Sequence, residues 1–199
     1  MSISPRLQKG ALLVLEPYTG IPLQTIHLQY NPESIRRSLQ PQSVGDQPDR
    51  TEVLRLKGPP IETIHCDVEL DATDALASSN AIAMKYGIQP QLATLELLIY
   101  PSSITLIANE VLSLIGTIEI LPMSSNLTIF VWGANRVTPV RLTAMEISEE
   151  AFDPNLNPIR AKVALTMRVL NVNDVGFLTP AGAMYMSYQL SKESMSKRS

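Results

Sequence analysis

Residues 159–170 alternate between apolar and polar side chains, and this alternation limits the folds open to the chain more than any other feature. The odd-numbered positions are apolar: Ile159, Ala161, Val163, Leu165, Met167 and Val169. The even-numbered positions are mostly polar and include Arg160, Lys162, Thr166 and Arg168. A period of two indicates a strand with one buried face. The preceding residues 152–158 contain two prolines and three Asx residues, which favour a chain reversal. We therefore predict a long antiparallel hairpin with residues 159–170 as its second arm.

The first arm of this hairpin alternates less cleanly. Its apolar residues lie first on one face and then on the other: Val140, Leu142 and Ala144, followed by Met145 and Ile147. A bulge, or a crossover between two packing environments, would explain the slip. Before this arm, residues 127–132 are mostly β-branched or aromatic and precede Gly133, so we predict a short buried strand there.

Further strands are expected in the first third of the chain. Residues 11–15 and 24–30 are predicted to form a hairpin around the turn at residues 17–20, and residues 34–40 a third strand. Residues 61–70 alternate again, which predicts a half-buried strand. Its inward residues would be Ile64, Cys66, Val68 and Leu70, and its outward residues Thr63, His65, Asp67 and Glu69.

The middle and the end of the chain show helical spacing instead. Pro90 can open a helix that continues towards Ile99, and residues 104–115 repeat the three-to-four residue spacing. The apolar run 104–121 approaches the length of a membrane span, but two carboxylates within it would be costly in lipid, so we predict a buried amphipathic helix. A last helix is expected over residues 179–196, with Thr179 as its N-cap. Its core side chains would be Met184, Tyr185, Tyr188 and Met195.

Residues 41–58 are polar and loop-like over most of their length. We predict an extended, mobile loop, because its few apolar side chains cannot offset the cost of ordering the backbone. Val53 to Leu56 could add to the edge of a neighbouring sheet, so that the loop becomes ordered on assembly.

The residue inventory argues against catalysis and against bound cofactors. His65 and Cys66 are neighbours on a predicted strand and would point to opposite faces, so they cannot share a proton. Cys66 is the only cysteine, which excludes an internal disulfide and suits a reducing compartment. His27 has no second histidine or cysteine at metal-binding spacing, and neither a phosphate loop nor a nucleophile elbow is present. We expect no catalytic residue, no cofactor and no metal.

Two charged groups on the hairpin remain to be explained. The acidic residues are Glu146, Glu149, Glu150 and Asp153, and the basic residues are Arg141, Arg160, Lys162 and Arg168. The acidic group could supply an acid and base pair or calcium ligands, or it could be a solvated strand end or a subunit contact. A formal charge of −3 and the lack of interleaved aromatic residues argue against nucleic-acid binding by the basic group.

Several strings in the chain resemble one protein family. They are FVWG at residues 130–133, VRLT at 140–143, EEAFDP at 149–154 with NPIRA at 157–161, HLQYNPES at 27–34, LDATD at 70–74 and GIQPQLA at 87–93. In this order and spacing they resemble the tube-like baseplate hub, or tube-initiation, proteins of phage-tail-like contractile injection systems. Larger members carry a LysM module after the tube-like domain, so this chain resembles a short form that lacks it.

The resemblance implies a mainly β fold with inserted helices (α+β), namely a tail-tube-like antiparallel β-barrel or sandwich. Residues 1–177 would form the tube-like domain, with a helical insertion around 74–121, and residues 178–199 a C-terminal helix and tail. It further implies a homohexameric ring that joins the trimeric central spike to the inner tube, starts tube assembly and contacts neighbouring baseplate proteins. The expected subunit interface comprises Arg141, Glu149, Glu150, Phe152, Asp153, Arg160, Lys162, Arg168, Val53, Leu54 and Leu56.

Two further expectations concern the location of the protein and an alternative function. The first ten residues lack the apolar core and cleavage site of a secretory signal, so we expect a cytoplasmic protein assembled into an injection-system particle, whether that particle is attached to a membrane or released. The alternative from a different class is a free-standing β-barrel binding module or small hydrolase that uses residues 41–58 as a lid. A stable monomer with a closed ligand pocket would favour this alternative.

Overall fold

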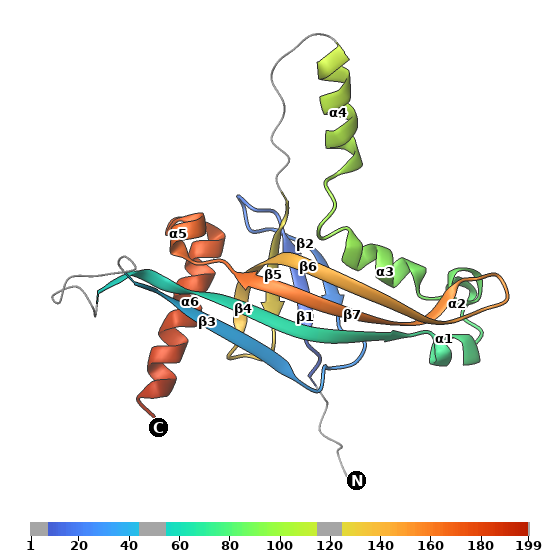
Figure 1. Cartoon of the computed structure of the whole chain (residues 1–199), viewed down its shortest axis with the longest axis horizontal. Helices are drawn as coiled ribbons and strands as arrows, with labels where there is room; N and C mark the ends of the chain where they lie inside the picture. Colours follow the sequence, from blue (N-terminus) through green and yellow to red (C-terminus); the bar gives the residue numbers. More distant parts are fainter. Residues whose placement is uncertain (1–7, 44–54, 115–124, 199) are drawn as a thin grey trace.

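One antiparallel sheet organises the chain in the computed structural model, which describes residues 8–43, 55–114 and 125–198 (Figure 1). Within these residues the sheet has seven strands in the order β2-β1-β5-β6-β7-β4-β3. The strands are β1 (Ala11–Leu15), β2 (Pro22–His27), β3 (Ile35–Ser43), β4 (Leu56–Asp71), β5 (Leu127–Val131), β6 (Val137–Phe152) and β7 (Pro158–Val169). Together with the helices described below, this confirms the predicted α+β fold.

The long hairpin is formed by β6 and β7, as the alternation predicted. Val163 and Leu165 are fully buried on β7, and they lie opposite Ile147 and Met145 of β6. The register shifts between Leu142 and Ala144, so that one extra residue bulges from β6. This bulge confirms the predicted slip. Before it the even-numbered residues Val140 and Leu142 lie opposite buried residues of β7, and after it the odd-numbered Met145 and Ile147 do so.

The sheet curls so that its two ends face one another across the core. In Figure 1, β6, β7, β4 and β3 run across the view, whereas β1, β2 and β5 run more steeply behind them. Leu12 of β1 and Phe130 of β5 join one apolar cluster with Ile64 of β4 and Leu165 of β7. Leu92 and Leu95 of α3 and Tyr185 of α6 belong to the same cluster, so two helices close the core from outside the sheet.

Between β4 and β5 the described residues form four helices, in the region where helices were expected. They are α1 (Thr73–Ala77), α2 (Ala81–Tyr86), α3 (Gln89–Glu96) and α4 (Ser103–Leu114). After β7 come α5 (Val172–Val175) and α6 (Pro180–Ser196). Thr179 caps α6 as predicted, because its Oγ1 accepts the Gly182 amide at 3.0 Å. Tyr185 and Tyr188 are buried as expected, but Met195 is exposed and the expectation that it packs in the core is wrong.

The boundaries of the predicted 41–58 loop require correction. Residues up to Ser43 continue β3, and β4 already begins at Leu56, with Ser43 paired to Leu56 and Gln42 to Gly58. Leu56 therefore pairs within its own chain. Val53 and Leu54 lie outside the described residues. Pro41 and the prolines after Gly58 obscured these strand ends in the sequence, since proline usually marks an interruption of a strand.

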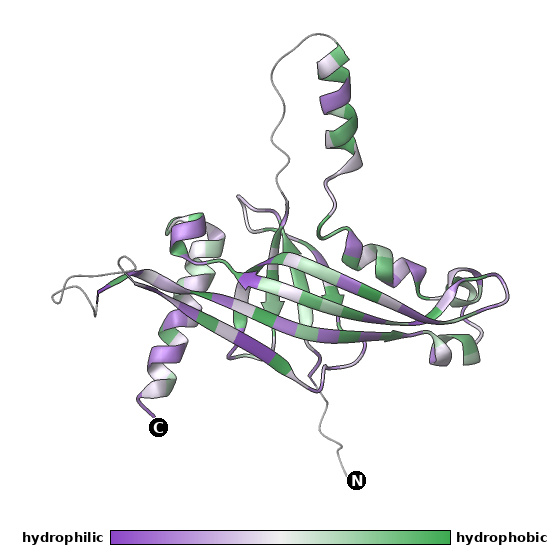
Figure 2. Cartoon of the chain, in the orientation of Figure 1, coloured by the Kyte–Doolittle hydropathy of each residue, from purple (hydrophilic) through white to green (hydrophobic). Residues whose placement is uncertain are grey.

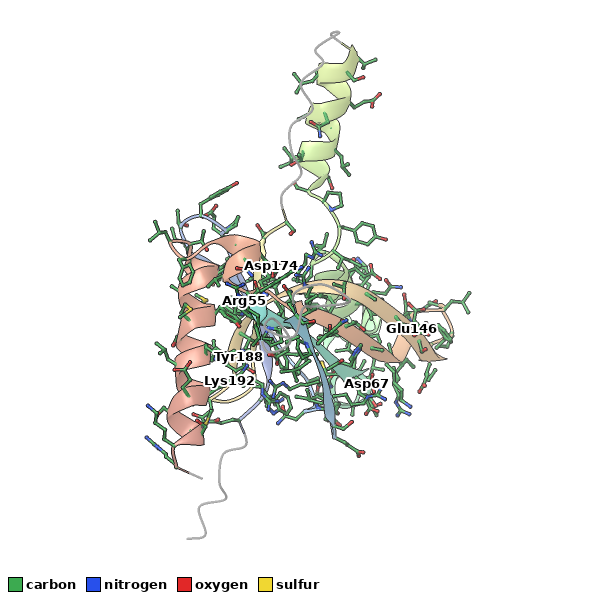
Figure 3. All side chains as sticks on the ribbon, turned by 60° about the vertical axis from the view of Figure 1, so that its left-hand side comes forward. Arg55, Asp67, Glu146, Asp174, Tyr188 and Lys192 are labelled. Carbon is green, nitrogen blue, oxygen red and sulfur yellow. The ribbon has the colours of Figure 1, made fainter. Side chains whose placement is uncertain are left out.

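The prediction that the run 104–121 forms a buried amphipathic helix is correct for the helix but wrong for its burial over residues 104–114, and residues 115–121 lie outside the described residues. A helix is present as α4, but none of its side chains is buried. In Figures 1 and 3, whose views differ by 60°, α4 projects away from the sheet. Among the residues described, no helix is both long and apolar enough to cross a membrane.

A candidate assembly surface

The outer face of β6, β7, β4 and β3 carries most of the predicted interface residues, in rows that cross the strands. Arg160 of β7 lies between Asp71 of β4 and Glu150 of β6, and Lys162 lies one row further along. Arg160 Nε donates to Asp71 Oδ2 at 3.0 Å, and Lys162 Nζ lies 3.6 Å from Glu150 Oε1. The charges in these rows therefore neutralise one another within the subunit.

Arg168 and Arg141 occupy the other end of the same face and differ in their partners. Arg168 Nη2 donates to Asp174 Oδ1 at 2.7 Å, and the other oxygen of Asp174 accepts the Asn171 amide at the start of α5. Arg141 lies opposite Arg168 across the hairpin and is exposed. Within the described part of the chain the Arg141 side chain makes no hydrogen bond or ion pair. Among the four predicted basic residues, Arg141 is thus the one whose charge no described residue neutralises.

Between these rows and the segment after β2 lies a hollow of about 510 Å³ with an acidic lining. Glu33, Asp67, Glu69 and Glu146 line it together with Lys162. Figure 3 labels Asp67 and Glu146, which flank the same position of β7. Across residues 8–43, 55–114 and 125–198, no group of three or more His, Cys, Asp or Glu side chains is placed to hold a metal ion. The hollow presents negative charge, but it is not built as a metal site.

Asp153 closes the turn at the tip of the hairpin. Its Oδ1 accepts the amides of Asn155 and Asn157 at 2.7 and 2.8 Å, and its Oδ2 accepts the Asn157 side-chain amide at 2.8 Å. The bonds from Asn157 are the main reason why the pKa of Asp153 lies below its usual value. Asp153 is therefore a turn-stabilising residue. Phe152, beside it, is exposed and open to a partner, and Glu149 is exposed on the adjoining part of β6.

A buried carboxylate on the inner face of the sheet holds α6 in place. Glu62 is 3% exposed, and it accepts from Arg37 Nε at 2.7 Å, Lys192 Nζ at 3.3 Å and the Tyr188 hydroxyl at 3.3 Å. Burial lowers the pKa of Lys192, although the nearby Glu62 opposes this shift. Because β3, β4 and α6 each contribute a partner, the cluster joins the helix to the sheet edge (Figure 3).

This cluster was not predicted from the sequence, although two signals pointed to it. Glu62 has the same parity on β4 as the buried Ile64, and Tyr188 and Lys192 are one helical turn apart. A carboxylate at an inward position needs cationic partners, but nothing local shows that they come from a helix more than a hundred residues away.

The Cys66 thiol lies in the core, where burial raises its pKa to about 12. His65 faces the other side of β4, and its Nδ1 lies 3.1 Å from Thr166 Oγ1. The two side chains therefore cannot act as a nucleophile and base pair, as the sequence indicated.

Two strand edges and several exposed apolar side chains have no partner within the described part of the chain. In the described part of the chain the sheet ends at β2 on one side and at β3 on the other. Exposed leucines, Leu23 and Leu39, lie on these two edges, and α4 exposes several large apolar side chains. Such edges and patches are typical of proteins that assemble.

Comparison with known proteins identifies the family of this chain. The family model described as contractile injection system tube protein matches residues 15–173, from the end of β1 through the start of α5. No curated protein matches the chain. Because the match spans well over half of the sequence, including the whole hairpin and the inserted helices, this chain belongs to the family of contractile injection system tube proteins.

Proposed function

We propose that this protein is a structural subunit of the baseplate hub, where it forms a ring that joins the central spike to the inner tube and initiates tube assembly. The observation that carries the proposal is the family match over residues 15–173. Its partners would be further copies of itself in a homohexamer, the trimeric spike, the inner tube proteins and neighbouring baseplate proteins. The role is structural and places the protein in an injection-system particle.

The two open sheet edges support a ring. An unpaired strand edge is a template for pairing with another chain, and uncontrolled pairing leads to aggregation. If β2 of one copy pairs with β3 of the next, each copy uses both edges once. Repetition of such a head-to-tail contact closes into a ring when the rotation fits a full turn. Closure of the ring therefore pairs both strand edges of every copy.

The outer face of the hairpin would then meet neighbouring subunits or the channel. The proposed interface is Arg141, Glu149, Glu150, Phe152, Asp153, Arg160, Lys162, Arg168 and Leu56, with Val53 and Leu54. Phe152 and Arg141 are the strongest members, since one is an exposed aromatic side chain and the other an unneutralised cation. Arg160, Lys162 and Arg168 are paired within the subunit and would act at the rim of the contact.

We further propose residues 1–177 as the tube-like domain, with the helical insertion around 74–121, and residues 178–199 as its C-terminal helix and tail. The Glu62 cluster and Tyr185 support a helix that closes the core of each subunit before assembly.

The first experiment tests the ring. Purified protein is examined by size-exclusion chromatography with light scattering and by negative-stain microscopy, and we expect closed rings. Leu23→Lys with Leu39→Lys should abolish them, because lysine on an edge strand opposes edge pairing. Ile82→Lys with Met84→Lys is the matched control, since these side chains on α2 are 59% and 58% exposed, against 55% and 50% for the leucines. A stable monomer at all concentrations would refute the ring.

The second experiment distinguishes a hub from a bulk tube protein. The labelled protein is assembled with the spike and inner tube proteins, and its position is read in micrographs. A hub subunit should mark one end of each tube. Label along the whole length would refute initiation and leave a general tube role.

A further inference from the structure

Four apolar side chains form one stripe along α4. Ile104, Ile107, Val111 and Leu114 are spaced by three, four and three residues, which places them on one face of the helix. Their exposed fractions are 79%, 65%, 47% and 78%. Figure 2 shows α4 as a mainly hydrophobic element that extends into solvent. A helix of this length is marginal by itself in water, and an exposed apolar stripe of this kind indicates a docking surface.

A groove with matching chemistry lies on the body of the subunit. It has a volume of about 450 Å³ between the end of α3, strands β5 and β6, and the segments around α5 and α6. Apolar side chains form most of its wall, among them Leu98, Leu127, Val140, Leu142 and Ala181. A groove of this character suits an amphipathic helix that inserts side chains one turn apart.

The charges of the two surfaces also match. Glu110 is the only charged residue of α4 and lies beside the stripe, since it is three residues after Ile107 and four before Leu114. Arg141 is the only charged residue among the described residues of the groove wall. Neither side chain makes a hydrogen bond or an ion pair within the described part of the chain. A helix seated in the groove could therefore pair one lone anion with one lone cation.

We propose that the stripe of α4 docks into this groove on a second copy of the chain. The proposal rests on the proposed ring function and adds a second contact to it, distinct from strand pairing at the sheet edges. The two surfaces are complementary to one another and neither is complementary to itself. Each copy offers one helix and one groove, so the contact can repeat from copy to copy around a ring or between stacked rings.

The arrangement within one subunit favours a second copy over the subunit's own helix. Leu98 and Ile99 line the groove and directly precede the short link to α4, so the helix starts at the rim of its own groove. From that rim α4 points outward in both views (Figures 1 and 3). Reversal at the link would be needed to seat the helix in its own subunit, whereas the outward position presents the stripe to a neighbour.

The test begins with Ile107→Lys combined with Val111→Lys. Because both side chains are exposed in the monomer, the variant should fold normally by circular dichroism and thermal unfolding. We expect self-association, measured by analytical ultracentrifugation, to weaken by about a hundredfold or more, since each buried aliphatic side chain is worth over a factor of ten. The control is again Ile82→Lys with Met84→Lys on α2. Unchanged association of the α4 variant overturns this inference and leaves the proposed ring standing.

A charge exchange identifies the occupant of the groove. Glu110→Arg and Arg141→Glu, each alone, should weaken association by roughly tenfold through like-charge contact. An equimolar mixture of the two single variants should recover association, because every helix then meets an opposite charge on the other variant. Recovery only when both changes are in one chain would show that α4 docks in its own subunit and would overturn the proposal. Association that is insensitive to both changes would do the same.

Discussion

Gly87 offers the most direct test of how the helical insertion meets the hairpin. It follows α2 with φ +58° and ψ −130°, and a Cβ added there would lie 2.1 Å from the carbonyl oxygen of Pro158 at the start of β7. The same oxygen accepts the Ile88 amide at 2.9 Å. Gly87→Ala therefore strains the backbone and also forces apart the two segments at their point of contact.

The magnitude follows from three contributions. A non-glycine residue in this backbone region costs about 1–3 kcal/mol. Moving the Pro158 carbonyl out of contact weakens the bond from Ile88, worth roughly 0.5–1.5 kcal/mol, and disturbs packing around it. Reduced freedom of the unfolded chain returns about 0.4–1 kcal/mol. We expect a net loss of roughly 3 kcal/mol in the free energy of unfolding.

Gly176→Ala separates the strain from the contact. Gly176 also has a positive φ, +77°, but an added Cβ there would meet nothing within 4 Å. Both variants carry similar backbone and unfolded-state contributions, so their difference, about 1–2 kcal/mol, measures the contact with the hairpin. Urea unfolding at one protein concentration provides the assay. Trp132, the only tryptophan, is the probe, since its ring stacks on Phe130 with centroids 6.1 Å apart. Equal losses in the two variants would refute the close approach.

Four further outcomes follow from the same structure. Leu165→Ala should lower the free energy of unfolding by roughly 2–5 kcal/mol, and a loss under 1 kcal/mol would mean that the inward face of the hairpin is misassigned. Arg37→Met should cost about 3 kcal/mol in urea unfolding, because it leaves a buried carboxylate short of a partner. Cys66 should resist iodoacetamide at pH 8 in the folded protein, since burial raises its pKa to about 12, and it should react in urea. Rapid labelling of the folded protein would contradict this. Arg160→Glu with Lys162→Glu should impair ring formation in micrographs. Thermal unfolding of the monomer should change little, because both intrachain pairs are solvent-exposed. Unchanged rings would count against an interface role.

The hairpin was predictable because its signals are local. Alternation over residues 159–170, the two prolines of the turn and the slip in the first arm all act between residues that are near one another in the sequence. The order of the strands was not predictable in this way. β1 lies beside β5 and β4 beside β7, and each pairing joins segments separated by long insertions, whose choice depends on packing across the whole core.

The candidate surface was predictable only in part, since spacing shows which face of an element is apolar but not what covers it. The three-to-four residue spacing predicted the helix at α4 correctly, yet the inference that its apolar residues are buried assumed a partner within the chain. Arg141 looked equivalent to the other basic residues of the hairpin. It differs because Asp71, Glu150 and Asp174 pair with Arg160, Lys162 and Arg168, and none of the three pairs with Arg141. Such differences depend on tertiary structure.

The distribution of satisfied and unsatisfied groups bears on the order of folding and assembly. Inside the subunit, the buried Glu62 carboxylate accepts hydrogen bonds from a strand and a helix, and Asp153 closes the tip of the hairpin. Outside, both sheet edges and the α4 stripe lack partners in the described part of the chain. A core that is complete in one chain can fold before it meets another copy, whereas open edges and an apolar stripe favour association once it has folded. A ring subunit needs this separation, because contacts that formed before the core was closed would pair unfolded edges at random and lead to aggregates instead of a ring of defined size.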